Sequence, residues 1–99
     1  MVDIDILNFE GFDWDEGNRD KNRLKHGVSE GECEELFFNA PLLIADDPKH
    51  SDIEPRFAAF GVTDAVRFLT VVFTRRQKLL RVISARDMNR REREFYKNL

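Results

Sequence analysis

The 99-residue chain has few of the residues on which disulfide, metal and nucleotide chemistry depend. It has one cysteine, Cys33, which excludes an internal disulfide and a cysteine-based metal cluster. It has two histidines, and the sequence contains no glycine-rich phosphate loop, no H-E-x-x-H motif and no G-x-S-x-G motif. We therefore expect neither a bound metal nor a cofactor.

Long apolar stretches are also missing, because no segment approaches the roughly 20 residues that a membrane span needs. The N-terminus carries Asp3 and Asp5 where a signal peptide carries positive charge. Both features predict a cytoplasmic protein without membrane contact. Hydrophobic residues still make up 41% of the chain, and nine aromatic residues are Phe, which is enough to bury the core of one domain over residues 1–99.

Charge is plentiful and unevenly placed along the chain. Residues 1–65 carry six Lys or Arg and sixteen Asp or Glu, a balance of −10, whereas residues 66–99 carry ten against three, a balance of +7. A basic C-terminal third favours a nucleic acid or an acidic protein as partner. The alternative is a helix face of solvated charge, which suits Arg90, Arg91 and Arg93 better than the arginines of the predicted strands.

Hydrophobic patterning predicts five strands, at residues 2–9, 42–45, 56–62, 67–74 and 79–85. The first belongs to residues 1–11, which form either a strand or an extended arm. Residues 75–78 are expected to make a tight charged turn, and Gly61 indicates a bulge or a close backbone approach. Short turns between successive strands favour antiparallel pairing.

Capping signals predict three helices. The first runs from an N-cap at Asp15 to His26 and ends at Gly27. The second follows a capping box at Ser29 and ends near residue 38, and the third covers residues 90–98 behind a capping box at Asn89. The resulting order, β-α-α-β-β-β-β-α, predicts an α+β fold in which helices flank a small antiparallel sheet.

Three arginines stand within or beside predicted strands. Arg81 interrupts an apolar run, Arg86 ends the same strand, and Arg56 opens an earlier strand behind Glu54. A guanidinium among apolar neighbours loses hydration unless it is paired or faces a cleft. Regular alternation places Arg81 and Arg86 on opposite faces, so they converge only if the strand bends or ends between them. Structural ion pairs, such as Glu54 with Arg56, are the alternative to a functional role.

Two further side chains are candidates for proton transfer. Histidine titrates near neutral pH, and His26 stands at the predicted end of a helix, where the dipole favours its charged form. The alternative is a helix-ending histidine without chemistry. Tyr96 is a second candidate, although an aromatic residue at its position more often packs a helix against a sheet.

Several short motifs follow one another in order. They are Phe12-x-Trp14-Asp15, Asn22, His26-Gly27-Val28-Ser29, Glu54-x-Arg56, Gly61, Val72-Phe73-Thr74, Arg81-Val82-Ile83-Ser84-Ala85-Arg86, Glu92 and Tyr96. Together they resemble the BrnT family, the toxins of type II toxin–antitoxin modules, over nearly the whole chain. The resemblance implies a RelE-like fold and a bacterial, metal-independent endoribonuclease that blocks translation. It also implies a ribbon-helix-helix antitoxin, through which alone operator DNA is contacted.

The resemblance also implies a mechanism on RNA, which supplies its own 2′-OH as the nucleophile. In that mechanism Arg81 and Arg86 hold the scissile phosphate, and Arg56 orients it or a neighbouring phosphate. His26 acts as acid or base, with Glu54 or Tyr96 in reserve. The products are a 2′,3′-cyclic phosphate and a 5′-hydroxyl. A further set of basic residues is expected to bind the RNA, namely Arg75, Arg76 and Lys78. The alternative is a catalytically inactive module of the same fold that binds nucleic acid or antitoxin.

Overall fold

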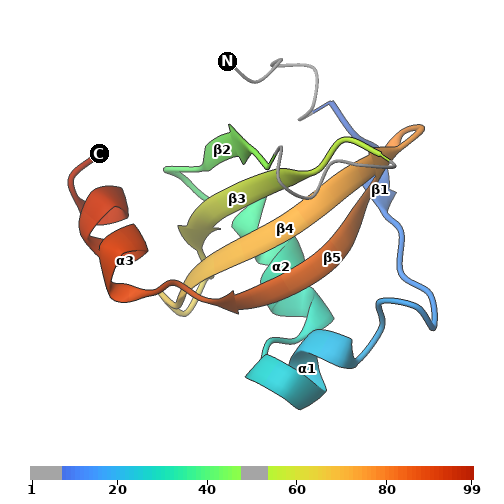
Figure 1. Ribbon diagram of the computed structural model, residues 1–99, viewed down its shortest axis with the longest axis horizontal. Helices are drawn as coiled ribbons and strands as arrows, with labels where there is room; N and C mark the ends of the chain where they lie inside the picture. The colour runs from blue at the N-terminus through green and yellow to red at the C-terminus, as the bar shows by residue number, and fades with distance from the viewer. Residues whose placement is uncertain (1–7, 48–53) are drawn as a thin grey trace.

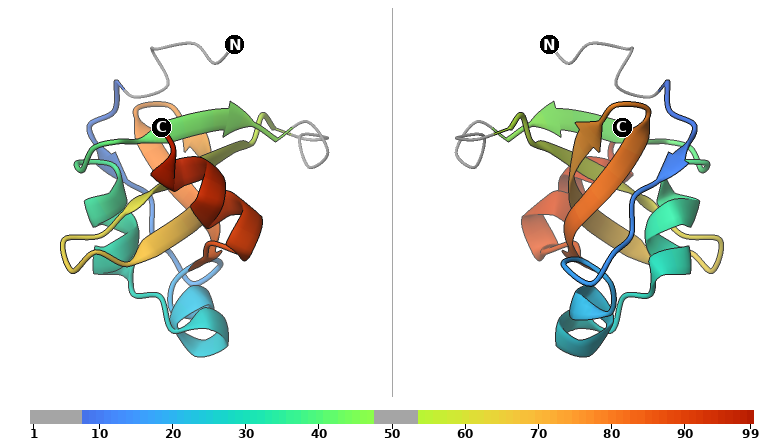
Figure 2. Two further views of the ribbon diagram at one scale, coloured as in Figure 1. Left: turned by 90° about the vertical axis from the view of Figure 1, so that its left-hand side faces the viewer. Right: turned by 90° about the vertical axis from the view of Figure 1, so that its right-hand side faces the viewer.

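The computed structural model describes residues 8–47 and 54–99. Five strands form one sheet in the order β1-β5-β4-β3-β2. Helix α2 lies across one face of the sheet, and α3 lies beside one end of its strands (Figure 1). Figure 2 shows that α2 lies on one side of the sheet and that α3 lies toward the other. The elements are β1 (Gly11–Phe12), α1 (Lys21–His26), α2 (Glu30–Leu36), β2 (Leu43–Asp46), β3 (Phe57–Val62), β4 (Phe68–Arg76), β5 (Leu79–Asp87) and α3 (Arg90–Lys97).

The α+β class is confirmed, but the prediction of a purely antiparallel sheet is wrong. Strands β2 to β5 pair antiparallel, whereas β1 pairs parallel to β5 through Gly11 with Leu79 and Phe12 with Leu80. The prediction rested on short turns between neighbouring strands. The neighbour of β1 is instead the last strand of the chain, and a long connection of this kind permits parallel pairing.

Of the predicted N-terminal elements, the first helix begins later than predicted. The strand predicted at residues 2–9 lies mostly outside the described residues, and Asn8 and Phe9 are not in a strand. Asp15 does not cap a helix but closes a turn, because its Oδ1 accepts a hydrogen bond from Gly17 N at 2.8 Å. Helix α1 starts only after Asp20, a residue with a φ of 63°. Its predicted end at Gly27 is confirmed, with a φ of 66°.

Both predicted capping boxes are confirmed. Ser29 caps α2 and Asn89 caps α3, each by accepting a hydrogen bond from the backbone N–H of a glutamate three residues on. The predicted turn at residues 75–78 is shorter in the structure, because Arg75 and Arg76 still belong to β4. Only two residues lie between β4 and β5, and the first of them, Gln77, has a φ of 56°, which suits a tight hairpin turn.

The core lies between the sheet and α2. Leu36 of α2 is completely buried, and so are the core-facing residues of β3, β4 and β5, namely Ala59, Leu69, Val71, Phe73, Leu80, Val82 and Ala85. A Cβ at Gly61 would stand 2.8 Å from Leu36 Cγ. The close approach predicted at Gly61 is therefore confirmed, since only glycine lets the helix sit this near to β3.

Two buried asparagines complete the outer edge of β5 beyond the short strand β1. Asn18 donates from Nδ2 to the carbonyl of Val82 at 2.9 Å, and Asn22 accepts at Oδ1 from the N–H of Ala85 at 2.9 Å. Strand β1 is too short to pair with these two backbone groups of β5, and the asparagine side chains bond to them in its place. Asn22, one of the motif residues of the sequence, thus has a structural role.

Arg67 joins the elements around His26. Its guanidinium bonds to Asp87 at 2.8 Å, to Glu32 at 3.2 Å and to the carbonyls of Gly27 and His26 at 2.8 and 3.2 Å. The end of β5, the start of α2 and the end of α1 are thereby tied together. The Arg67 hydrogen bond lowers the pKa of Asp87, so this carboxylate is charged at neutral pH.

Within residues 8–47 and 54–99, no helix is long and apolar enough to cross a membrane.

Candidate functional site

A β-bulge brings the strand arginines onto one face of the sheet. The pairing of β4 with β5 changes from Val72 opposite Ser84 to Phe73 opposite Val82, so Ile83 is an extra residue in β5. On β4, Thr70 and Thr74 share a face because they are four residues apart. Their partners on β5, Arg86 and Arg81, therefore share that face as well. Regular alternation would have placed the two arginines on opposite faces, and the extra residue in the bulge places them on the same face.

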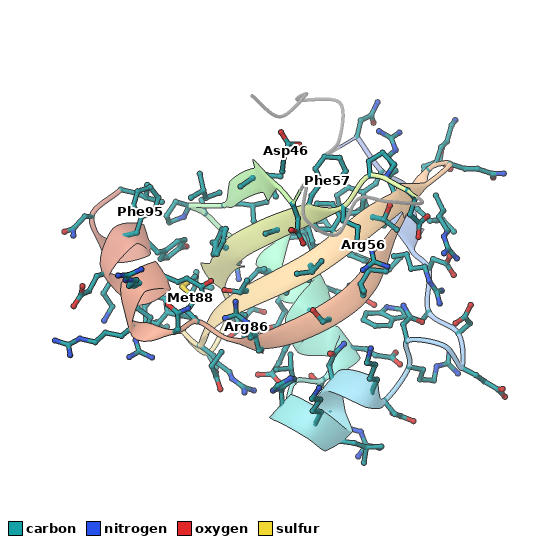
Figure 3. The ribbon with its side chains drawn as sticks, viewed as in Figure 1. Asp46, Arg56, Phe57, Arg86, Met88 and Phe95 are labelled. Atoms are coloured by element: carbon teal, nitrogen blue, oxygen red, sulfur yellow. The ribbon has the colours of Figure 1, made fainter. Side chains whose placement is uncertain are left out.

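The face of the sheet turned away from α2 carries a groove of about 500 Å³. Strands β3, β4 and β5 form its floor and Glu92 of α3 borders it. Figure 3 shows Arg86 on β5 and Arg56 just before β3, the strands that flank β4. The groove is lined by Asp47, Arg56, Ala58, Phe60, Thr70, Val72, Ile83, Ser84, Arg86 and Glu92. Two of the three arginines singled out in the sequence thus line one concave surface.

Arg86 is held in place by Glu92. Its Nη1 and Nη2 bond to the two carboxylate oxygens of Glu92 at 2.7 and 3.0 Å, a bidentate pair. Thr70 donates to the same carboxylate at 3.0 Å, and the N–H of Asn89 donates to it at 2.9 Å. The Arg86 side chain is nevertheless 42% exposed. Its guanidinium is therefore fixed in orientation and still accessible to a ligand in the groove.

Both members of this pair stay charged. Burial alone raises the pKa of Glu92, but the hydrogen bonds from Arg86, Asn89 and Thr70 outweigh it, and the pKa lies below its usual value. The hydrogen bond to Glu92 raises the pKa of Arg86. Glu92 therefore serves better as a support for Arg86 than as a general base, because a carboxyl of lowered pKa accepts protons weakly at neutral pH.

Arg56 enters the groove from the other side. It precedes β3, in which Phe57 pairs with Phe73 and Ala58 with Val72, so it falls on the same face as Ala58. Its carbonyl accepts a hydrogen bond from the N–H of Asp47 at 2.9 Å, which holds Asp47 at the border of the groove. The side chain is half-buried. Arg56 and Arg86 can therefore act together on a ligand lying across β4.

Arg81 shares the face but has a different environment. Its Nη1 and Nη2 bond to the two oxygens of Asp15 at 2.9 Å each, and Asp13 lies at 3.5 Å. The side chain is only 10% exposed, and Arg81 does not line the groove. The hydrogen bond to Arg81 lowers the pKa of Asp15, so the pair is ionic at neutral pH. Arg81 thus fixes the segment after β1 against β5.

The three basic residues of the predicted turn lie at the hairpin end of β4 and β5. Arg75 Nε bonds to the carbonyl of Gln77 at 2.8 Å. Arg76 pairs with Glu54 at 3.1 Å, and Lys78 pairs with Glu10 at 3.3 Å. The groove lining in the described part of the chain does not include them. They form a charged surface separate from the Arg56–Arg86 groove.

The three candidates for proton transfer are scattered. His26 is exposed at the end of α1 and does not line the groove. Glu54 is bound by Arg76, whose hydrogen bond lowers the pKa of this carboxyl. Tyr96 is buried, which raises its pKa, and its hydroxyl donates to the carbonyl of Pro41. Of the sequence-predicted site residues, the groove therefore contains Arg56 and Arg86.

The groove also contains residues that the site prediction missed, namely Asp47, Thr70, Ser84 and Glu92. The sequence indicates Glu92 as the acid of a capping box and as one of the motif residues, but not as a site residue. Glu92 follows Arg86 by six residues and stands in the first turn of the predicted helix, and this spacing could have indicated an ion pair. Thr70 and Ser84 could not be found, because their place on the open face depends on the strand register and on the bulge at Ile83.

The described residues lack a side-chain cluster of the kind that holds a metal ion. Within residues 8–47 and 54–99, no group of three or more His, Cys, Asp and Glu side chains lies close enough together to hold a metal ion. Burial raises the pKa of the Cys33 thiol to about 12, which keeps it protonated and unreactive.

The structure therefore defines a class of protein, an α+β domain with a groove on the open face of its sheet that two arginines line. Residues 14–92 match the model of a family described as "Ribonuclease toxin, BrnT, of type II toxin-antitoxin system". The match covers most of the chain, which therefore belongs to the BrnT family of ribonuclease toxins. Membership of a type II toxin–antitoxin family implies an antitoxin partner. No curated protein matches the chain.

Proposed function

We propose that the chain is the toxin of a type II toxin–antitoxin module and that it cleaves RNA in the groove between Arg56 and Arg86. The convergence of these two guanidinium groups on one open groove carries the proposal. Phosphate is the anion that the bidentate fork of arginine fits best, and RNA offers one phosphate per nucleotide. The family description of a ribonuclease toxin agrees with this chemistry.

In the proposed mechanism the 2′-oxygen attacks the adjacent phosphorus while the bond from phosphorus to the 5′-oxygen breaks. The 2′ proton leaves to a base, and the 5′-oxygen takes up a proton. Arg86 and Arg56 bind the non-bridging oxygens, where negative charge grows in the transition state. Because Glu92 already fixes Arg86, little reorganisation is needed during the reaction. The products are a 2′,3′-cyclic phosphate and a 5′-hydroxyl.

His26 is our candidate for the proton transfer, although it lies outside the groove. The pKa of Asp87 is lowered first by Arg67 and, more weakly, by Arg93 and His26, which places His26 within electrostatic reach of the residue after Arg86. The role requires the scissile phosphate to lie at the Arg86 end of the groove, close enough to His26 for a proton transfer that is direct or passes through one water molecule. Histidine is suited to the role because it titrates near neutral pH.

The family also supports a proposal about partners. We propose a ribbon-helix-helix antitoxin that covers the Arg56–Arg86 groove, binds operator DNA on behalf of the complex and prevents RNA cleavage. An acidic surface on the antitoxin would complement Arg56 and Arg86 and would speed association. We further propose that the fold is RelE-like and that RNA cleavage blocks translation.

The test is cleavage of a single-stranded RNA by the purified chain, with mapping of the new RNA ends. The Arg56→Ala/Arg86→Ala double variant is compared with a matched control, Arg19→Ala/Arg90→Ala, which removes two exposed arginines paired with Glu30 and Glu94. We expect 5′-hydroxyl ends from the wild type and the control and a loss of at least about 100-fold in the first variant. Equal cleavage by both double variants would refute the assignment.

A second candidate function is RNA or antitoxin binding without cleavage. It is favoured by the lining of the groove, which contains no histidine among the described residues. Such a module would bind RNA with an affinity that falls steeply as salt rises, because bound phosphates release counterions. Salt-sensitive binding by a folded protein that creates no new RNA ends would establish this alternative.

A further inference from the structure

A second groove, of about 440 Å³, lies between α3 and the outer strands of the sheet. Its lining is apolar apart from two charged residues of α3. The residues are Leu43, Ala45, Phe60, Arg91, Glu92, Phe95 and Tyr96. Figure 3 shows Phe95 on α3, on the side of the helix next to β2. Phe95 is 62% exposed, whereas Tyr96 beside it is buried.

This apolar groove adjoins the Arg56–Arg86 groove. Phe60 and Glu92 line both of them. The register of β2 against β3 pairs Leu43 with Phe60 and Ala45 with Ala58, so the floors of the two grooves lie on the same face of one sheet. A single ligand with an anionic part and an apolar part could therefore occupy both at once.

We propose that the apolar groove binds the base of a nucleotide next to the phosphate held by Arg56 and Arg86, with the base stacked on Phe95. The proposal rests on the proposed function and specifies how the substrate lies. A nucleobase has flat apolar faces, and an exposed phenyl ring beside a phosphate site is the usual platform for it. Arg91 borders the same groove and can meet the phosphate on the far side of that base.

The apolar lining predicts the kind of specificity that this subsite confers. Carbon-rich walls offer few hydrogen bonds to the edge of a base, so they distinguish bases by size and stacking strength. We therefore expect purines to be bound more tightly than pyrimidines at this position. We expect all four bases to be accepted.

The test uses single-stranded RNA oligonucleotides in which 2′-deoxy substitution prevents cleavage, so that affinity is measured whether or not the chain is a nuclease. Each oligonucleotide carries either a full set of bases or one abasic position, which is moved along the strand. Wild type is compared with Phe95→Ala, Phe95→Trp and the control Phe38→Ala, which removes an exposed ring from the segment after α2. Thermal unfolding of each variant verifies its fold.

We expect Phe95→Ala to weaken binding about 10-fold, and Phe95→Trp and Phe38→Ala to bind as wild type does. One abasic position should weaken binding by wild type to the same extent and have no further effect on Phe95→Ala. The proposal would be overturned if the losses of RNA affinity from Phe95→Ala and from the abasic position were independent and additive. It would also be overturned if Phe95→Ala bound RNA as tightly as wild type, even where this variant had lost binding to the antitoxin. Absence of RNA binding by the wild type would refute the proposed function itself.

Discussion

The two ends of strand β5 each carry an arginine in a bidentate ion pair, but the pairs differ in what surrounds them. Arg81 is 10% exposed and is bound by Asp15 and Asp13 at the edge of the sheet. Arg86 is 42% exposed and is bound by Glu92 alone among the described carboxylates, at the border of a groove. An arginine enclosed by carboxylates stabilises a fold, whereas one fixed by a single carboxylate beside a groove can still bind a ligand.

The same comparison applies to the whole molecule. Arg67, like Arg81, has its donors directed to Asp87, Glu32 and two backbone carbonyls. Arg56, like Arg86, lines the groove. The arginines of the chain therefore occupy two kinds of environment, and neither composition nor net charge separates them.

The largest expected effect comes from Arg86→Ala. If the groove is the site, the initial rate of RNA cleavage should fall by about 10² to 10³-fold, because one donor to the transition-state oxygens is lost. Arg86→Lys should recover only part of the rate, since an ammonium group cannot form the bidentate fork. Arg90→Ala on the exposed side of α3 is the control. A full rate in Arg86→Ala would remove Arg86 from the site.

Arg81→Ala should act mainly on stability. Loss of the buried stem and of the contacts with the two aspartates should lower the free energy of unfolding by about 2 kcal/mol, less than for a fully buried pair because Asp15 is exposed. Urea unfolding measures this loss. The cleavage rate per folded molecule should fall much less than in Arg86→Ala. A large loss of rate at unchanged stability would instead make Arg81 a phosphate-binding residue.

Acid should weaken both ends of β5. The pKa values of Asp15 and Glu92 lie below their ordinary values of 3.8 and 4.5, so the unfolded chain binds more protons than the folded one. The resulting stability is fully present above about pH 5 and is lost as the pH falls through the lowered pKa values. Urea midpoints between pH 7 and pH 3 measure the decline, which should be smaller in Glu92→Gln. A pH-independent midpoint would contradict the ionic account.

The smallest effect is expected from the helix caps. Asn89→Ala should destabilise the protein by about 1 kcal/mol and Ser29→Ala by a similar amount, because each removes one capping box. Only Asn89 precedes the helix that carries Glu92, so only Asn89→Ala should also weaken RNA binding, by a few-fold. Titration with a 2′-deoxy-substituted RNA compares the two variants. Equal RNA affinity in both would show that α3 does not position the groove.

Local patterns predicted those parts of the fold that depend on local interactions. The boxes at Ser29 and Asn89 predicted the starts of α2 and α3, and Gly61 predicted the close approach to Leu36. The parallel strand β1 was missed, because a two-residue strand has no periodicity and its partner lies at the other end of the chain. The late start of α1 was missed because an aspartate can accept a backbone N–H hydrogen bond in a turn as well as at the start of a helix. Asp15 does so in a turn, from the N–H of Gly17.

The candidate site was only partly predictable for a similar reason. Arg56 and Arg86 were identifiable from their positions in apolar strands, but their convergence depends on an extra residue at Ile83. The enclosure of Arg81 depends on Asp15, which is 66 residues away in the sequence. Side-chain partners at such separations follow from the tertiary fold and have no local signature.

The most direct test of the central claim is an NMR titration that follows the Nε–H signals of the arginines. A non-cleavable, 2′-deoxy-substituted RNA is added to the wild-type chain, and the signals are assigned with single Arg→Lys variants. The account predicts that the signals of Arg56 and Arg86 shift and saturate together, whereas those of Arg81 and Arg67 stay in place. Shifts at Arg81 with Arg56 and Arg86 unchanged would contradict the claim that the open groove is the RNA site.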